Sequence, residues 1–174
     1  MRKIKLLIVD DSIVFREALS KALSKDLMIE VVATAVDPFD ARDKILQYHP
    51  DVMTLDVEMP KMNGIEFLRK LIPQYPIPTI VISSINDCVF EAIQLGAVDF
   101  IKKPDGKAIL TNRDFFNDLI TKIKIAVNAK VQQGTLHKKS FIDSSMPSHQ
   151  VQNKIIAIGA STGGTVALTD VITE

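Results

Sequence analysis

Acidic residues stand at the ends of two short apolar runs. Asp10 and Asp11 follow "IKLLIV" (4–9), and Asp56 closes "DVMTLD" (51–56). Carboxylates that are held close together raise one another's pKa unless a cation neutralises them. Oxygen ligands with room for water suit Mg²⁺, which usually binds one or two carboxylates together with the phosphate oxygens of a substrate. If the fold brings these acids together, they predict a magnesium site.

Hydroxyl and ammonium groups end two further apolar runs. Ser83 and Ser84 close "TIVISS" (79–84). Lysines, Lys102 and Lys103, close "VDFIKK" just before Pro104. A lysine and a hydroxyl aimed at the acids would bind the oxygens of a phosphoryl group while a carboxylate attacks it in line. The pattern therefore predicts a phosphate acceptor.

Each of these residues also has an explanation without chemistry. Asp11 or Ser12 can cap a helix, Asn63 and Gly64 can form a turn, and the lysines can lie on a solvated surface. For any single residue this alternative is the better one. The joint pattern favours the phosphate acceptor, because four separate strand ends would otherwise carry suitable groups by accident.

The elements that position these groups alternate along the chain. The four runs above and "MIEVVATA" (28–35) are typical of strands buried on both faces, and the stretches between them have helical spacing. Five strand and helix repeats predict an α/β fold with a doubly wound, five-stranded parallel sheet. In such a sheet the functional crevice lies outside the carboxyl ends of the strands, so all the groups named above meet at one edge. The helical spacing is carried by Ile13, Val14, Ala18, Leu19, Ala22 and Leu23 in the first helix, and by Phe115, Leu119, Ile123 and Val127 in the last (112–131).

Residues 1–130 resemble the receiver domain of bacterial two-component response regulators, which has a flavodoxin-like fold. The resemblance lies in "IVDDS" (8–12), "LDVEMPKMNG" (55–64), "VISS" (81–84) and "LGAVDFIKKP" (95–104). One departure is that "INDCVFEAIQ" (85–94) is a few residues shorter than the family pattern, which predicts a trimmed loop and helix after the fourth strand.

The resemblance implies a role for each residue of the predicted site. Asp56 would be the phospho-acceptor, and Mg²⁺ would be bound by the carboxylates of Asp10, Asp11 and Asp56 and by the backbone carbonyl of Glu58. Lys102 would be a neighbour without a role. The phosphoryl-binding and switch residues would be Ser83, Lys103 and Phe100, the last being the aromatic residue whose rotamer follows the Ser83 hydroxyl.

A polar stretch, 131–153, is predicted to be a linker because it is rich in Gln, Ser, Lys and His and has no sustained period. Residues 154–174 then restart a strand and turn with "KIIAIGASTGG". The motif G-x-S-x-G within it is typical of a nucleophilic serine, here Ser161, beside an oxyanion site. It also suits a dinucleotide pyrophosphate, or a turn without chemistry.

A receiver followed by a polar linker and "IGASTGG" resembles the chemotaxis protein-glutamate methylesterases. The resemblance implies that Ser161 is the nucleophile, with Thr162 and Gly163 as oxyanion donors, in an amputated second α/β domain. It implies a chemotaxis histidine kinase and methylated chemoreceptors as partners, with phosphorylation relieving inhibition of ester hydrolysis and glutamine deamidation. The family's downstream His and Asp are absent, so we expect residues 1–174 to accept phosphate without hydrolysing esters.

Two rival functions stay open at this point. The first is a stand-alone receiver that acts by binding a partner protein without catalysis. The second is a nucleotide-dependent oxidoreductase behind a receiver.

Composition limits the partners further. Lys plus Arg and Asp plus Glu number 21 each, so no overall field attracts nucleic acid or an anionic membrane. No apolar run is long enough to insert into a membrane. The single cysteine, Cys88, predicts a reducing compartment, and we expect a cytoplasmic protein in which Cys88 is a small buried hydrophobe.

Overall fold

The computed structural model describes residues 2–84, 88–104, 112–129 and 131. Most of the predicted linker, and all of 154–174 with Ser161, Thr162 and Gly163, lie outside the described residues. The domain boundaries proposed from the sequence therefore stay predictions.

Five strands and five helices alternate in the described chain, which confirms the α/β prediction. Each predicted strand boundary lies within one residue of the observed one. The last helix ends earlier than predicted, because its apolar spacing runs on beyond the point where the backbone leaves the helix. The elements are β1 (Ile4–Val9), α1 (Ile13–Leu23), β2 (Ile29–Ala35), α2 (Pro38–Tyr48), β3 (Val52–Asp56), α3 (Gly64–Leu71), β4 (Thr79–Ser83), α4 (Val89–Gln94), β5 (Asp99–Lys102) and α5 (Arg113–Ala126).

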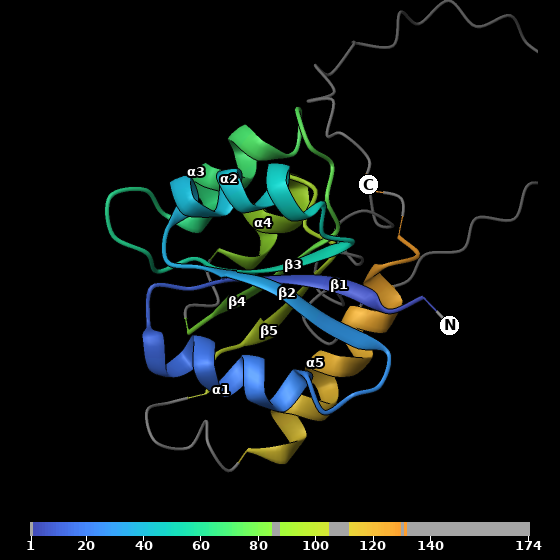
Figure 1. Cartoon of the computed structure of the whole chain (residues 1–174). Coiled ribbons are helices and arrows are strands. Elements are labelled where there is room, and N and C mark those ends of the chain that lie inside the picture. Colours follow the sequence, from blue (N-terminus) through green and yellow to red (C-terminus); the bar gives the residue numbers. More distant parts are fainter. Residues whose placement is uncertain (1, 85–87, 105–111, 130, 132–174) are drawn as a thin grey trace, which may run out of the picture. The chain divides into compact units, whose positions relative to one another are not determined.

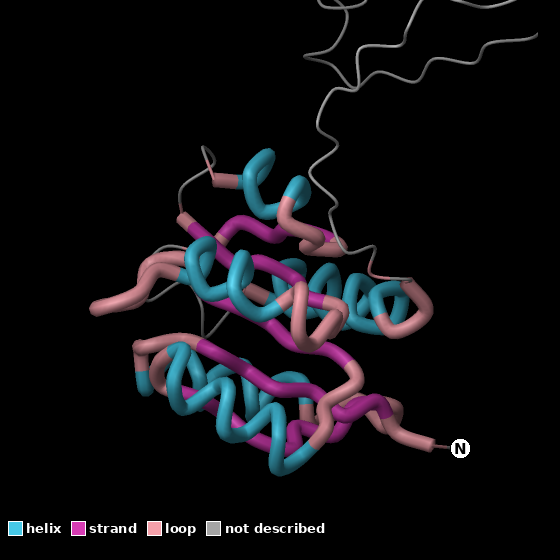
Figure 2. The backbone as a smooth tube through the Cα atoms, turned by 90° about the horizontal axis from the view of Figure 1, so that it is seen from above, coloured by secondary structure: helices cyan, strands magenta, loops and turns pink. Residues whose placement is uncertain are grey.

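The strands form one parallel sheet in the order β2-β1-β3-β4-β5. Helices α1 and α5 cover one face, and α2, α3 and α4 cover the other (Figure 1). Figure 2 shows the same strands from above, with helices packed along the sheet. The strand order reverses between β1 and β3, so the carboxyl ends of these two strands flank the switch point where such folds bind ligands.

The core has two layers, one on each face of the sheet. In β1, Leu7 and Val9 pack toward α2, α3 and α4, whereas Leu6 and Ile8 pack toward α1 and α5. This alternation follows from the two-residue period of a strand. It explains why β1 is an unbroken apolar run in the sequence.

The buried face of α1 differs in part from the predicted one. Leu19 and Leu23 are buried as expected, together with Phe15. Ile13 and Val14, at the start of the helix, are 61% and 58% exposed. They belong to the first turn of the helix, where the periodic pattern overestimates the buried face.

Side-chain oxygens cap the N-termini of α1 and α3, the helices that follow β1 and β3. Ser12 caps α1 by accepting a hydrogen bond from the Phe15 N–H, and Asn63 caps α3 by accepting one from the Glu66 N–H. Asn63 thus starts a helix rather than forming an isolated turn. Helix α4 has only six residues, in agreement with the short sequence after β4.

Candidate phosphoryl and metal site

Three carboxylates meet at the switch point of the sheet. Asp10 follows β1, Asp11 is next to it, and Asp56 ends β3; one oxygen from each lies within 4.8 Å of the others. Asp10 and Asp56 are each only 1% exposed, whereas Asp11 is exposed. The structure therefore brings together the three acids that the sequence singled out.

Lys103 is the cation that this cluster contains. Its Nζ lies 2.7 Å from Asp10 Oδ2 and 2.7 Å from Asp56 Oδ2. It also lies 4.4 Å from the centre of the Phe15 ring, so an aromatic face covers the ammonium group on another side. One lysine cannot neutralise three carboxylates, and the site keeps an excess of negative charge.

Burial controls the protonation of this pair. Burial raises the pKa of Asp10 from 3.8 to about 6; the charge of Asp56 adds to that rise, and the hydrogen bond from Lys103 only partly offsets it. Burial acts to lower the pKa of Lys103, but its bonds to Asp10 and Asp56 outweigh this and raise the pKa above the ordinary value. Lys103 therefore stays charged, whereas burial disfavours the ionised form of Asp10.

The donor set fits Mg²⁺. All three groups supply hard oxygen ligands, two of them buried and one facing solvent, which leaves room for water and for phosphate oxygens. The remaining oxygens of the buried acids are already oriented: Asp10 Oδ1 accepts from the Ser12 N–H at 2.8 Å, and Asp56 Oδ1 accepts from the Glu58 N–H at 3.1 Å.

The loop after β3 is shaped by a close approach of its two ends. A Cβ atom on Gly64 would lie 2.1 Å from the Asp56 carbonyl oxygen and 2.9 Å from the Val57 Cα. The Gly64 N–H also donates to the Val57 carbonyl at 3.0 Å. Only glycine allows the start of α3 to pack this tightly against the backbone that carries Asp56.

Ser83 lies at the end of β4, next to the end of β3. The residue before it, Ile82, is the cross-strand partner of Asp56. The Ser83 carbonyl accepts a hydrogen bond from the Lys103 backbone N–H at 2.9 Å. The Ser83 side chain is fully buried, and its hydroxyl accepts from the Cys88 thiol at 3.7 Å. Phe100, in β5, is half-buried against the core layer of α2, α3 and α4.

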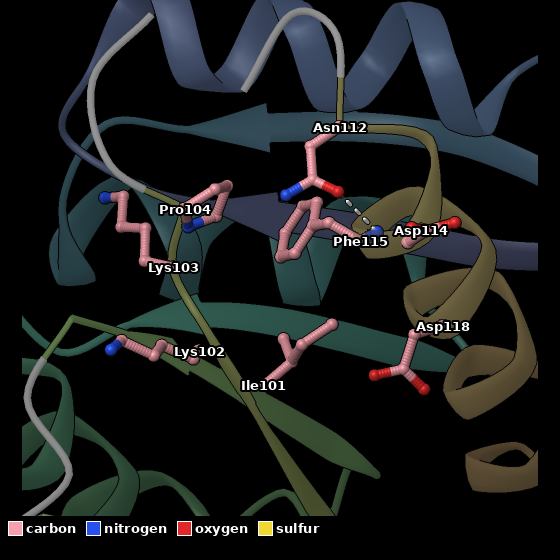
Figure 3. A pocket seen from close by; sticks show the side chains of 8 residues that line it. All are labelled: Ile101, Lys102, Lys103, Pro104, Asn112, Asp114, Phe115 and Asp118. Atoms are coloured by element: carbon pink, nitrogen blue, oxygen red, sulfur yellow. Dashed lines mark hydrogen bonds between the residues drawn. The ribbon is translucent and has the colours of Figure 1, made fainter. Parts of the chain in front are cut away.

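Lys102 takes no part in the ion pairs that Lys103 makes with the acids. Figure 3 shows both lysines beside a hollow of about 720 Å³, with their ammonium groups turned away from Asp114 and Asp118 at its other end. Lys102 is exposed, and no ion pair to it occurs within the described ranges. Lys103, which follows the last residue of β5, is thus the lysine that reaches the buried acids.

Two contacts escaped the sequence interpretation. The Glu58 carboxylate accepts hydrogen bonds from the Ser84 N–H and hydroxyl, which joins the loops after β3 and β4. Arg16 Nη1 donates to the carbonyls of Asp10 and Asp11. The first contact spans 26 positions, and no local pattern predicts it. The only signal for Arg16 is its place one helical turn beyond the Ser12 cap.

Known receiver domains match the part of the chain that carries this site. The family described as the response regulator receiver domain matches residues 6–113. The response regulator domain of CheB from Thermotoga maritima has a TM-score of 0.68 and 34% identity, and the match covers 74% of this chain and 99% of that one. A chain of the CheX–CheY–BeF3–Mg²⁺ complex from Borrelia burgdorferi has a TM-score of 0.62 and 26% identity, covering 74% and 92%.

Sequence relatives extend the match beyond the receiver. A protein-glutamate methylesterase/protein-glutamine glutaminase 2 of Syntrophomonas wolfei is 52% identical over 99% of this chain and 50% of its own length. A protein of Syntrophotalea carbinolica, named protein-glutamate methylesterase/protein-glutamine glutaminase, is 41% identical over 99% of this chain and 52% of its own. The chain thus spans about half the length of the curated relatives it matches.

Proposed function

The chain belongs to the response regulator receiver family, and from this premise we propose that it is a phosphorylation switch whose acceptor is Asp56. The observation that carries the proposal is the cluster of Asp10, Asp11 and Asp56, with oxygens within 4.8 Å of one another and Lys103 bonded to two of them. Such a site has the acceptor, the metal ligands and the cation that transfer of a phosphoryl group requires.

In the proposed reaction, a carboxylate oxygen of Asp56 forms a bond to the phosphorus atom of the donor. The bond between phosphorus and the leaving group breaks at the same time, and the leaving group takes that electron pair. Mg²⁺, held by the carboxylates of Asp10, Asp11 and Asp56 and by the Glu58 carbonyl, would supply positive charge beside the phosphoryl oxygens. Lys103 moves part of its hydrogen bonding from the carboxylates to the new phosphoryl group.

The switch itself is assigned to Ser83 and Phe100. The Ser83 hydroxyl bonds a phosphoryl oxygen and gives up its contact with Cys88, and the Phe100 ring follows. The position of Ser83, one residue beyond the cross-strand partner of Asp56, supports this assignment. A local charge thereby changes the surface near α4 and β5.

For the protein that carries the rest of the second domain, we propose the activity named for its relatives. It would hydrolyse methyl esters of glutamate residues on chemoreceptors and deamidate glutamines, with Ser161 as nucleophile and the Thr162 and Gly163 N–H groups as oxyanion donors. Phosphorylation of Asp56 by a chemotaxis histidine kinase would relieve inhibition. The support is the identity over 99% of this chain, which favours the methylesterase over a stand-alone adaptor.

A cytoplasmic location is part of the proposal, since the kinase and the receptor glutamates would be reached there. In the part of the chain that the structure describes, no helix combines the length and the apolar character needed to cross a bilayer.

Methanol release from methylated chemoreceptors tests the proposed activity. Residues 1–174 with acetyl phosphate and Mg²⁺ should release none, because they span only about half the length of the relatives for which the activity is named. A protein with the complete second domain should release methanol faster when the phosphodonor is added, and Ser161→Ala should abolish the release. Stimulation that persists after Asp56→Asn would contradict the proposal.

A further inference from the structure

Of the three clustered acids, Asp11 is the one whose side chain no other described residue holds. Asp10 and Asp56 each accept a backbone N–H and the Lys103 ammonium group. Among the described residues, no hydrogen bond or ion pair reaches the Asp11 carboxylate. The direction of this carboxylate is therefore set by its own backbone.

That backbone is held by Arg16. One nitrogen of the guanidinium group, Nη1, donates to the Asp10 carbonyl at 2.7 Å and to the Asp11 carbonyl at 2.9 Å. These two carbonyls belong to the two planar peptide units on either side of the Asp11 Cα. Because only φ and ψ separate such units, holding both of them fixes the direction in which the Asp11 side chain leaves the chain.

The base of the Arg16 side chain is itself fixed. The backbone N–H of Arg16 donates to the Ser12 carbonyl at 3.0 Å, in the first turn of α1. Helix α1 is anchored to the sheet by the buried side chains of Phe15, Leu19 and Leu23. The guanidinium group thus transmits the position of a packed helix to the loop that carries the acids.

The charge of Arg16 also acts on a carboxylate of α2. Burial acts to raise the pKa of Asp40, but hydrogen bonds from Lys44 and the Val36 N–H, together with the charges of Lys44 and Arg16, hold it below its ordinary value. Arg16 is half-buried. It binds carbonyl oxygens of the β1 loop, which leaves every carboxylate oxygen of Asp11 available to a metal ion.

We infer that Arg16 is a positioning residue for the metal site, which acts by aiming the Asp11 carboxylate through the two flanking carbonyls. The inference rests on the proposed function, since it assumes that Asp11 binds Mg²⁺. Groups that orient metal ligands commonly affect metal affinity by about 10- to 100-fold when removed.

Calorimetric titration of residues 1–174 with Mg²⁺ tests this inference. Arg16→Gln should raise the Kd for Mg²⁺ on the order of tenfold, because the Asp10 and Asp11 carbonyls lose their hydrogen bonds to Arg16. The matched control is Arg42→Gln, at an exposed position of α2 where Arg42 pairs with Asp43; it should leave the Kd unchanged. Arg16→Lys keeps the charge and loses the planar N–H geometry, so it should weaken binding nearly as much as Arg16→Gln.

The Asp11→Asn background distinguishes an effect of Arg16 on the orientation of the Asp11 carboxylate from a general effect of Arg16 on the structure. If Arg16 acts through Asp11, Arg16→Gln should change the Kd by less than about twofold once Asp11 is replaced, because the two effects are coupled. Weak Kd values can be followed by NMR titration. If Arg16→Gln does not fold, as judged by circular dichroism, the same cycle is completed with Arg16→Lys.

The outcomes are distinct. Any of three results would overturn the inference while leaving the metal site intact. These are an effect of Arg16→Gln on the Kd that persists at full size in the Asp11→Asn background, wild-type affinity in Arg16→Gln, or complete recovery by Arg16→Lys. Wild-type protein that binds no Mg²⁺, or Asp11→Asn that binds it normally, would instead overturn the proposed function on which the inference rests.

Discussion

Replacing Asp10 by Asn should stabilise the protein at neutral pH when Mg²⁺ is removed. Asp10 is only 1% exposed, and the charged groups that shift its pKa are Lys103 and Asp56. Burial and the charge of Asp56 both disfavour its ionised form, and the bond from Lys103 compensates only in part. The fold therefore bears a free-energy cost at this position that an amide side chain does not carry.

The size and direction of the effect follow from the pKa of Asp10, which rises from 3.8 to about 6 on folding. Because the folded state holds the proton more tightly, the stabilising contribution is complete below pH 3.8 and is lost as the pH rises through about 6. At about 1.4 kcal/mol per pKa unit, the cost at neutral pH is about 3 kcal/mol.

Urea unfolding in EDTA, followed by far-ultraviolet circular dichroism from about pH 4 to about pH 8, measures this cost. The free energy of unfolding of Asp10→Asn, minus that of the wild type, should grow by about 2.5 kcal/mol across the range, because at about pH 4 the unfolded chain has already lost part of its proton. Loss of the Lys103 hydrogen bond adds an offset but not the pH dependence. Asp43→Asn, which removes an exposed carboxylate of α2, is the control and should give a flat difference. A flat difference for Asp10→Asn would refute the reasoning.

Three further perturbations follow from the same geometry. Lys103→Met leaves Asp10 and Asp56 without their cation and should cost about 3 kcal/mol of unfolding free energy in EDTA at neutral pH, whereas Lys102→Met should cost little; equal values would contradict the assignment. Gly64→Ala places a Cβ against the Asp56 carbonyl and should cost about 1–3 kcal/mol in urea unfolding; an unchanged midpoint would count against that contact. Mg²⁺ at about 100 times its Kd should stabilise the wild type by about 2.7 kcal/mol in thermal unfolding, and no rise in Tm would argue against a metal site.

Much of the fold could be predicted because a doubly wound sheet makes simple patterns. Strands buried on both faces give unbroken apolar runs, and the predicted run 4–9 is β1 without change. Helix ends were harder to predict, because apolar spacing does not report where the backbone leaves the helix. Val127 continues the spacing of α5, yet the helix ends at Ala126.

The acids of the site could be placed from the sequence because the ends of neighbouring strands must meet. Their supporting contacts could not. Arg16 bonds to carbonyl oxygens, which every residue has, so no residue pattern marks its target. The contact between Glu58 and Ser84 depends on how two loops approach each other after folding. The choice of Lys103 over Lys102 needed the family resemblance, since the two are adjacent and identical.

The central claim is that Asp56 accepts a phosphoryl group in a site that requires Mg²⁺. Mass spectrometry of residues 1–174 after treatment with acetyl phosphate and borohydride, which reduces an aspartyl phosphate, locates the acceptor. We predict modification of the peptide that contains Asp56, dependent on Mg²⁺ and absent from Asp56→Asn. Modification that is unchanged in Asp56→Asn, or equally extensive in EDTA, would contradict the account.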